Sequence, residues 1–261
     1  MQKIYKYPRT YHLEGSGIQH GDEDLSVMPV RSLAGQYVVV EEKMDGANSA
    51  ISFSDDNQLL LQSRGHYLSG GPREKQFDLF KAWAYRYAGE LWQTLGTRYI
   101  MYGEWLYAKH TMFYTDLPHY FLEFDIFDKE QERFLSTERR KEFLFLLPFV
   151  SSVKVLYTGQ IDSMEQLVSM IGPSHFIRGD LKERLQAYCQ EKDFNVAQAL
   201  KETDTSGLME GLYLKVEADG YVQERYKYVR RGFLQTVFDS ESHWQDRPIL
   251  PNCLSAGVSL F

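Results

Sequence analysis

Hydrophobic and polar positions along the chain predict two blocks of strands with helices between them. Stretches that are β-branched or aromatic, or that alternate with a period of two, are typical of strands when turn residues bound them. Asp219 and Gly220 form a dipeptide typical of a hairpin turn between the last two predicted strands. The predicted strands cover residues 37–42, 47–53, 58–64, 98–107, 119–127, 208–216 and 221–229.

A helical period occurs in two regions. Between about 73 and 95, apolar residues recur every three or four positions and form one helical face, which Gly96 is expected to cap. Residues from about 136 to 206 are predicted to be mostly helical, with one helix opened by Asp162 and Glu165 and another over 181–189. The first 35 residues and those after 230 show little pattern. Strands joined by hairpins, with segregated helices, favour an α+β fold around antiparallel sheets.

Composition narrows the class of protein. Apolar residues make up 43% and charged residues 25% of the 261 residues, which excludes a disordered chain, a collagen-like repeat and a coiled coil. The longest apolar run, 143–150, is far shorter than the ~20 residues of a membrane helix. Cys189 and Cys253 are too few for a disulfide framework or a four-cysteine zinc site, so we expect a reduced, cytoplasmic protein.

The net charge of −7 argues against a general affinity for nucleic acid, which usually leaves a basic footprint. Two local clusters of basic residues offset this argument, because charges act mainly within a Debye length of about 8 Å. The clusters are at 225–231 and 139–141. Any binding to a duplex is therefore expected to be weak and salt-sensitive, and to depend on a partner or a pre-paired substrate.

Residues 42–46, Glu-Lys-Met-Asp-Gly, carry the most informative chemistry. Lys43 lies at the end of a predicted strand, Asp45 follows two residues later, and Gly46 allows the backbone to approach a ligand closely. A lysine attacks only as a free amine, and nearby cations depress its pKa and supply that form. Taken alone, the stretch also fits a charged turn between two strands.

Further segments follow Lys43 in a fixed order, at 61–65, 102–105, 121–126, 210–215 and 224–230. The ordered set resembles the covalent nucleotidyltransferases, which comprise ATP-dependent RNA ligases, DNA ligases and messenger RNA capping enzymes. Asn48 stands where DNA ligases and capping enzymes usually carry arginine, and it resembles the RNA ligase branch. The resemblance implies two antiparallel sheets with flanking helices in a single nucleotidyltransferase domain over 1–261.

Within that domain, residues 136–206 are expected to form a helical insertion between two motifs. The tail, 231–261, is too short for the OB-fold that follows the last motif in DNA ligases and capping enzymes. We therefore expect no OB-fold. The role of the insertion stays open between packing and contact with nucleic acid.

The resemblance also implies a mechanism and its residues. Lys43 attacks the α-phosphorus of ATP and carries AMP, which passes to a 5′-phosphate end before a 3′-hydroxyl joins that end. Relatives usually have Lys-x-Lys where this chain has Arg225 and Lys227. The implied catalytic residues are Lys43, Arg225 and Lys227; those that bind ATP are Glu42, Lys43, Asn48, Arg64, Glu104, Phe124 and Lys227. Asp45, Glu104 and Glu210 are implied to hold Mg²⁺ or Mn²⁺ through water.

The expected function is an ATP-dependent RNA ligase in RNA repair, with RNA ends as partners and an end-healing kinase or phosphatase as a further one. A DNA ligase or a capping-type guanylyltransferase shares the same chemistry and stays an alternative. A non-catalytic sensor of nucleotides or RNA ends is the alternative from another class, and it predicts ATP binding without a covalent intermediate.

Overall fold

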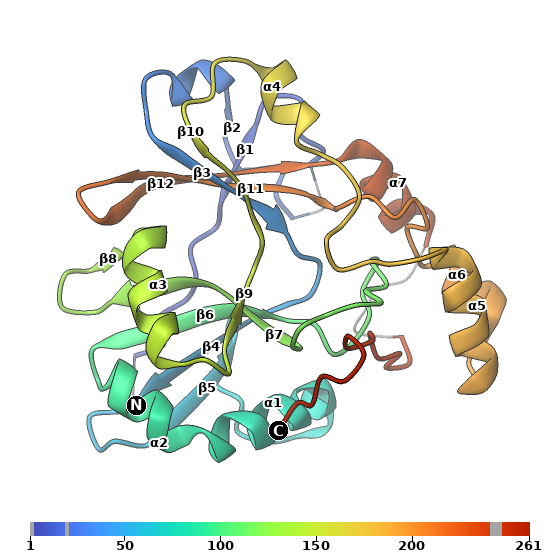
Figure 1. The fold of residues 1–261 in the computed structure, drawn as a ribbon, viewed down its shortest axis with the longest axis horizontal. Helices are drawn as coiled ribbons and strands as arrows, with labels where there is room; N and C mark the ends of the chain where they lie inside the picture. Colours follow the sequence, from blue (N-terminus) through green and yellow to red (C-terminus); the bar gives the residue numbers. More distant parts are fainter. Residues whose placement is uncertain (1–2, 19–20, 241–246) are drawn as a thin grey trace.

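The chain folds into two sheets that lie face to face, in a computed structural model that describes residues 3–18, 21–240 and 247–261 (Figure 1). The first sheet has the strand order β10-β3-β11-β12-β1-β2, and the second has the order β5-β4-β6-β7-β8 with β9 beside β7. The first sheet comprises β1 (Tyr11–Leu13), β2 (Val27–Met28), β3 (Val38–Lys43), β10 (Val155–Gly159), β11 (Gly211–Ala218) and β12 (Tyr221–Val229). The second comprises β4 (Ala47–Phe53), β5 (Leu59–Ser63), β6 (Tyr99–Trp105), β7 (Phe121–Asp128), β8 (Arg133–Phe134) and β9 (Ser151–Ser152).

Helices cover the outer faces and the flanks, which confirms the predicted α+β class (Figure 1). None of the helices in the described ranges is long and apolar enough to cross a membrane. The helices are α1 (Asp78–Arg86), α2 (Ala88–Leu95), α3 (Thr137–Leu146), α4 (Met164–Ser169), α5 (Leu181–Glu191), α6 (Val196–Lys201) and α7 (Arg231–Asp239), with 3-10 turns η1 (Val30–Leu33) and η2 (Pro72–Phe77).

Two apolar cores hold the helices on the sheets. Phe80, Trp83 and Leu91 of α1 and α2 pack in one cluster with side chains of the second sheet such as Ile51 and Trp105. The outer face of the first sheet packs against α4 in another cluster. The single helix predicted over 73–95 is wrong in its continuity: it begins as the 3-10 turn η2 and breaks at Tyr87, although its buried face is the predicted one and Gly96 ends it.

The chain crosses from one sheet to the other immediately after Lys43. Strand β3 ends at Lys43 in the first sheet, and β4 begins at Ala47 in the second. The predicted turn at 43–46 therefore joins the two sheets. A Cβ atom at Gly46 would lie 2.7 Å from the carbonyl oxygen of Trp105, so only glycine fits this crossing.

The segment 136–206 is more than the predicted helical insertion, because it supplies strands to both sheets. Strand β10 pairs with β3, and β9 pairs with β7. Helices α5 and α6 pack with Phe113 and Leu250 in a small core of their own. The predicted cap of α4 is displaced by one residue, since Ser163 rather than Asp162 accepts the capping hydrogen bond.

The termini hold structure that the pattern did not predict. Strands β1 and β2 extend the first sheet through parallel pairs, so the sheets are mostly rather than wholly antiparallel. The tail contains α7, and residues 241–246 of it lie outside the described residues. The described part of the tail forms no OB-fold barrel.

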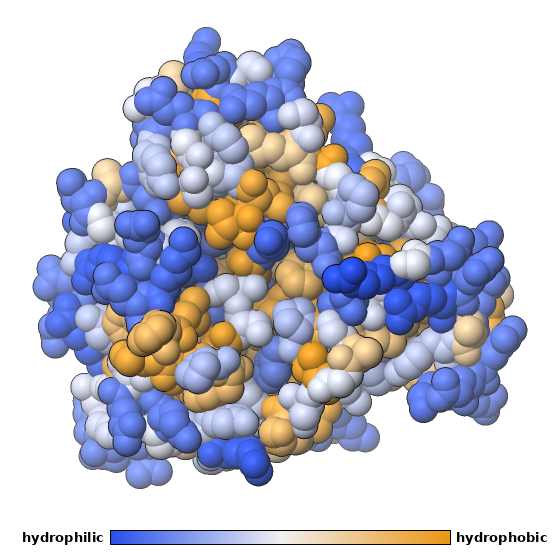
Figure 2. Space-filling model, viewed as in Figure 1, coloured by the Kyte–Doolittle hydropathy of each residue, from blue (hydrophilic) through white to orange (hydrophobic). Residues whose placement is uncertain are grey.

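The longest apolar run lies at the end of α3 and is only partly buried. Leu147 and Val150 are in the core, whereas Phe145 and Leu146 are 85% and 63% exposed. Figure 2 shows the apolar surface over this helix. The run is therefore a helix end that packs on one side.

Buried charged side chains form a continuous chain between the two sheets. Arg140 of α3 contacts Glu41 and Glu123 at 2.9 Å each, and Lys215 lies 2.8 Å from Glu41. Asp125 continues the chain, at 3.4 Å from Lys215 and 3.1 Å from Arg225. Three carboxylates and three cations alternate, so the layer is neutral. Such a layer is stable only while each charge keeps its partners. The prediction that 139–141 is a basic surface is thus wrong for Arg140.

We predict that Arg140→Met lowers the free energy of unfolding by about 3–5 kcal/mol, because Glu41 and Glu123 lose the cation that compensates their burial. Denaturation in urea at neutral pH measures the loss. Lys141→Met is the matched control, since Lys141 is the exposed neighbour on the same helix. Equal stability of the two variants would contradict a structural role for the charge chain.

Candidate active site

Lys43 and Glu210 meet inside the first sheet, at the point where β3 ends and β11 begins. Lys43 ends β3 and pairs in register with Gly211, the first residue of β11, so the residue before β11 lies beside it. The Lys43 Nζ donates a hydrogen bond of 2.6 Å to Glu210 Oε1. The Lys43 side chain is 22% exposed and that of Glu210 is 1% exposed. The sheet register therefore presents the lysine to solvent and holds its partner in the interior.

The electrostatics of this pair keep Lys43 protonated in the protein alone. Burial lowers the pKa of Lys43, but the charges of Glu210, Glu104 and Asp45 outweigh burial and raise it above its ordinary value. Burial raises the pKa of Glu210 to about 7, against the opposing effect of Lys43. Deprotonation of Lys43 therefore needs a ligand that changes the field around it.

Glu104 and Asn48 face the same region from the second sheet, where they pair in register across β6 and β4. Glu104 Oε1 accepts a hydrogen bond of 3.1 Å from the Gly46 N–H. Burial raises the pKa of Glu104 to about 8, while Lys43 and Arg64 act in the opposite direction. Three predicted residues, Asn48, Glu104 and Glu210, thus lie in the region of Lys43, and Arg64 is near enough to Glu104 to act on its pKa.

Two predicted site residues, Asp45 and Glu42, also anchor loops. Asp45 Oδ2 accepts hydrogen bonds of 2.7 Å from the backbone N–H groups of both Thr111 and Met112, so it anchors that loop. Glu42 is buried and accepts hydrogen bonds from the Ser174 hydroxyl and from His175. The structure gives both carboxylates an anchoring role, on loops that sequence reasoning did not connect with them.

Phe124 lies at a β-bulge of β7. Tyr102 pairs with Asp125 and Gly103 pairs with Glu123, so Phe124 is the extra residue of β7. Its ring centroid is 6.5 Å from that of Tyr213 and 5.1 Å from that of Tyr7. Tyr213 lies in a motif that the sequence singled out, but Tyr7 belongs to the unpatterned N-terminal segment and no sequence signal marked it.

Arg225 and Lys227 lie two residues apart on β12, as predicted, but they contact different partners. Val229 and Lys43 both pair with Gly211, so they stand at the same level of the sheet. Arg225 precedes Val229 by four residues of β12, which separates it from the level of Lys43 by about 13 Å along the strand. Arg225 pairs with Asp125 and lies 3.8 Å from the Phe134 ring centroid. Lys227, nearer to Lys43, donates a hydrogen bond of 2.5 Å to Asp22.

The predicted metal site offers oxygen atoms but no complete set of ligands among the described side chains. The described residues contain no group of three carboxylate, histidine or cysteine side chains close enough to hold a metal by themselves. Glu210 Oε2 and Asn48 Oδ1 are nevertheless buried without a hydrogen-bond partner. Unsatisfied oxygens suit a hard cation that takes its remaining ligands from water and phosphate. These residues therefore fit Mg²⁺ or Mn²⁺ bound together with a nucleotide.

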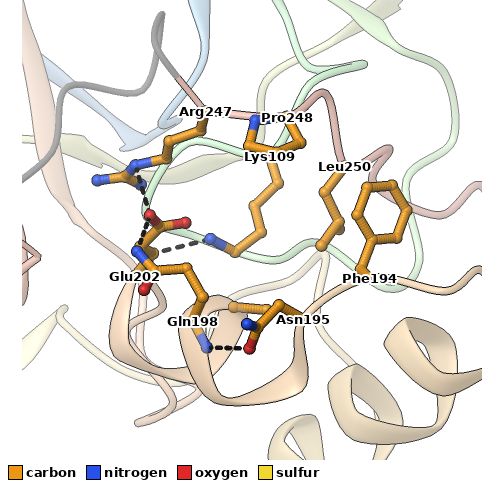
Figure 3. A pocket seen from close by; sticks show the side chains of 9 residues that line it. Lys109, Phe194, Asn195, Gln198, Glu202, Arg247, Pro248 and Leu250 are labelled. Atoms are coloured by element: carbon orange, nitrogen blue, oxygen red, sulfur yellow. Dashed lines mark hydrogen bonds and ion pairs between the residues drawn. The ribbon is translucent and has the colours of Figure 1, made fainter.

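A separate pocket lies between α6 and the C-terminal segment (Figure 3). Lys109 points into it and donates hydrogen bonds to the backbone carbonyls of His110 and Glu202. Burial lowers the pKa of Lys109 to about 8. Because its ammonium group caps the end of α6, we interpret Lys109 as a structural residue.

Comparisons with known proteins identify the family and the fold of this chain. The family model described as RNA ligase matches residues 36–229, so the chain belongs to the RNA ligase family. Similar solved structures include Naegleria gruberi RNA ligase mutants with AMP and Mn and with ATP and Mn, at 18% identity and TM-scores of 0.55 and 0.54. The same ligase with pyrophosphate has 19% identity and a TM-score of 0.54. Each match covers 80% of this chain and 54% of that chain, and shows the fold. A comparison with curated proteins finds no match.

We predict that Glu104→Gln makes stability less dependent on pH. Between the ordinary pKa of 4.5 and the raised pKa of about 8, the folded protein retains a proton that the unfolded chain has released. Stability therefore falls as the pH rises through this window, and glutamine removes that contribution while keeping an acceptor for Gly46. Urea unfolding in EDTA at pH 5, 6.5 and 8 should show a growing advantage of the variant. A constant difference at all three pH values would contradict the raised pKa.

Proposed function

We propose that this protein is an ATP-dependent RNA ligase that works through a lysyl-AMP intermediate on Lys43. The observation that carries the proposal is the Lys43–Glu210 pair, at 2.6 Å, inside the region that matches the RNA ligase family. The chain spans about half the length of the Naegleria ligase that it resembles, so activity, substrates and partners are all part of the proposal.

In the first step, the free amine of Lys43 attacks the α-phosphorus of ATP. A nitrogen–phosphorus bond forms, the bond to the β-phosphate oxygen breaks, and pyrophosphate leaves. The proton that Lys43 must lose lies on the hydrogen bond to Glu210 Oε1, so this carboxylate is positioned to accept it. AMP then passes to a 5′-phosphate, and attack by a 3′-hydroxyl releases it.

A bound Mg²⁺ or Mn²⁺ would neutralise phosphate charge and favour the neutral form of Lys43. Glu210 and Glu104 are the residues we assign to it, with water between, because Glu210 Oε2 lacks a hydrogen-bond partner. Asp45 is left out of this assignment, since its carboxylate anchors the loop at 111–112.

The other side chains bind and orient the nucleotide. We assign Lys227 to the phosphates, because it is the cation of β12 nearest the level of Lys43. Asn48 and Arg64 are assigned to phosphate and ribose, beside Glu104. Phe124 is assigned to stacking on the adenine ring, for which planar aromatic side chains are suited. Arg225 serves the buried charge chain in this assignment.

RNA ends, in a nicked or broken strand, are the proposed substrate, and RNA repair is the proposed setting. Family membership and Asn48 support RNA over DNA. The net charge of −7 supports dependence on a pre-paired end or an end-healing kinase or phosphatase.

We predict that the protein stripped of AMP with pyrophosphate gains the mass of one AMP when it is incubated with ATP and Mg²⁺. Lys43→Ala should gain none, because it lacks the attacking amine. Intact-mass spectrometry measures both, and Lys141→Ala is the control for a surface lysine. Absence of an adduct under every metal and nucleotide tested would contradict the proposal and favour a sensor.

Two related assays separate the alternative enzymes. Labelling with GTP in place of ATP would indicate a capping-type enzyme. Nicked duplexes with RNA or DNA on the 3′-hydroxyl side separate an RNA ligase from a DNA ligase, and we expect joining to require RNA there.

A further inference from the structure

The N-terminal segment holds Lys227, although this segment lies outside the region that matches the family. The match begins at residue 36, whereas β1 lies at Tyr11–Leu13. Strand β1 pairs in parallel with β12 and places His12 directly beside Lys227. The proposed phosphate-binding lysine is therefore flanked by residues that the family model does not include.

Asp22 links these residues through one carboxylate. Its Oδ2 accepts a hydrogen bond of 2.5 Å from Lys227 and lies 3.3 Å from His12 Nε2. Its Oδ1 accepts a hydrogen bond of 3.3 Å from Arg9. The side chains of Asp22 and Lys227 are only 16% and 10% exposed. The carboxylate of Asp22 is thus held by three side chains, those of Lys227, His12 and Arg9.

The other ring nitrogen of His12 contacts Ser16. Its Nδ1 lies 2.8 Å from the Ser16 hydroxyl, which also accepts a hydrogen bond of 2.9 Å from the Val229 N–H. Because the carboxylate of Asp22 only accepts, His12 Nε2 must carry the hydrogen that faces it. The contacts form a connected support from the backbone of β12 through Ser16, His12 and Asp22 to the ammonium group of Lys227.

Such a support matters because a lysine side chain is a point charge on a flexible stem. Phosphoryl transfer depends mainly on positioning and on neutralising charge, so an ammonium group that is already ordered contributes more than a mobile one. We propose that Asp22 is a positioning residue that fixes Lys227 for adenylyl transfer. This proposal rests on the proposed ligase function.

The alternative role for Asp22 is a gate that occupies Lys227 until nucleotide displaces it. The structure favours positioning, because Arg9 and His12 share the charge of the carboxylate and hold it independently of Lys227. A gate predicts that removal of the charge tightens ATP binding. A positioning role predicts that it slows the reaction at saturating ATP.

The test is single-turnover formation of lysyl-AMP over a range of ATP concentrations. Asp22→Asn should lower the rate at saturating ATP about tenfold or more, with a much smaller change in the ATP concentration for half-maximal rate. Asp24→Asn is the matched control, because Asp24 lies in the same loop and pairs with Arg9 but its side chain is 70% exposed. Asp24→Asn should keep the wild-type rate.

A second comparison isolates the path through Lys227. In a Lys227→Met background, Asp22→Asn should lower the rate no further, whereas a general effect on folding would lower it by the same factor in both backgrounds. If Asp22→Asn fails to fold, Asp22→Glu replaces it in the same two backgrounds. This variant keeps the negative charge but displaces it.

An unchanged rate, tighter ATP binding or an equal loss in both backgrounds would overturn the positioning role. These results leave the proposed function intact, since they require wild-type protein that forms the adduct. Failure of the wild type to form it would overturn the proposed function instead.

Discussion

A buried chain of alternating charges joins the two sheets. Glu123, Arg140, Glu41, Lys215, Asp125 and Arg225 contact one another in that order. Sheets usually meet through apolar side chains, but here the facing surfaces also carry fully buried ions. Because each ion needs its partners, this layer fixes which strands lie opposite each other. The residues around Lys43 therefore keep their spacing without a ligand.

The site lies where that arrangement meets the crossing of the chain between sheets. Lys43 ends a strand of the first sheet, and after three intervening residues the chain enters the second sheet, which carries Asn48 and Glu104. The crossing places the amine, the carboxylate of Glu210 and the residues of the second sheet around one space. In the protein alone the amine keeps its proton, since the surrounding carboxylates raise the pKa of Lys43. The proposed site is thus assembled in advance, and in the proposed reaction a nucleotide and a cation would shift Lys43 to its neutral form.

The sequence predicted those features that local pattern determines. The signals for the strands are β-branched residues within them and turn residues beside them, at 38–43, 47–53, 211–218 and 221–229. The buried face of the helices at 78–95 is indicated by apolar residues that recur every three or four positions. The grouping of Lys43, Asn48, Glu104 and Glu210 was also predictable, because these residues lie in motifs whose order resembles that of the covalent nucleotidyltransferases.

Long-range partners were not predictable. Arg140 belongs to a run of basic residues that is typical of a surface, and only the opposing Glu41 and Glu123 explain its burial. Asp45 and Glu42 have their partners in loops more than sixty residues away, so their anchoring role had no local signal. Strand β1 is three residues long and pairs with a strand over two hundred residues later, which no periodicity indicates.

The central claim is that Glu210 holds Lys43 in its charged form until nucleotide and metal bind. Titration of the Lys43 side chain by NMR, with labelled lysine and Lys43→Arg for assignment, tests it most directly. We expect a pKa above the ordinary 10.5 in the protein alone and a lower value with Mg²⁺ and a non-hydrolysable ATP analogue. A pKa that is already below 10.5 without ligand, or that does not change on binding, would contradict it.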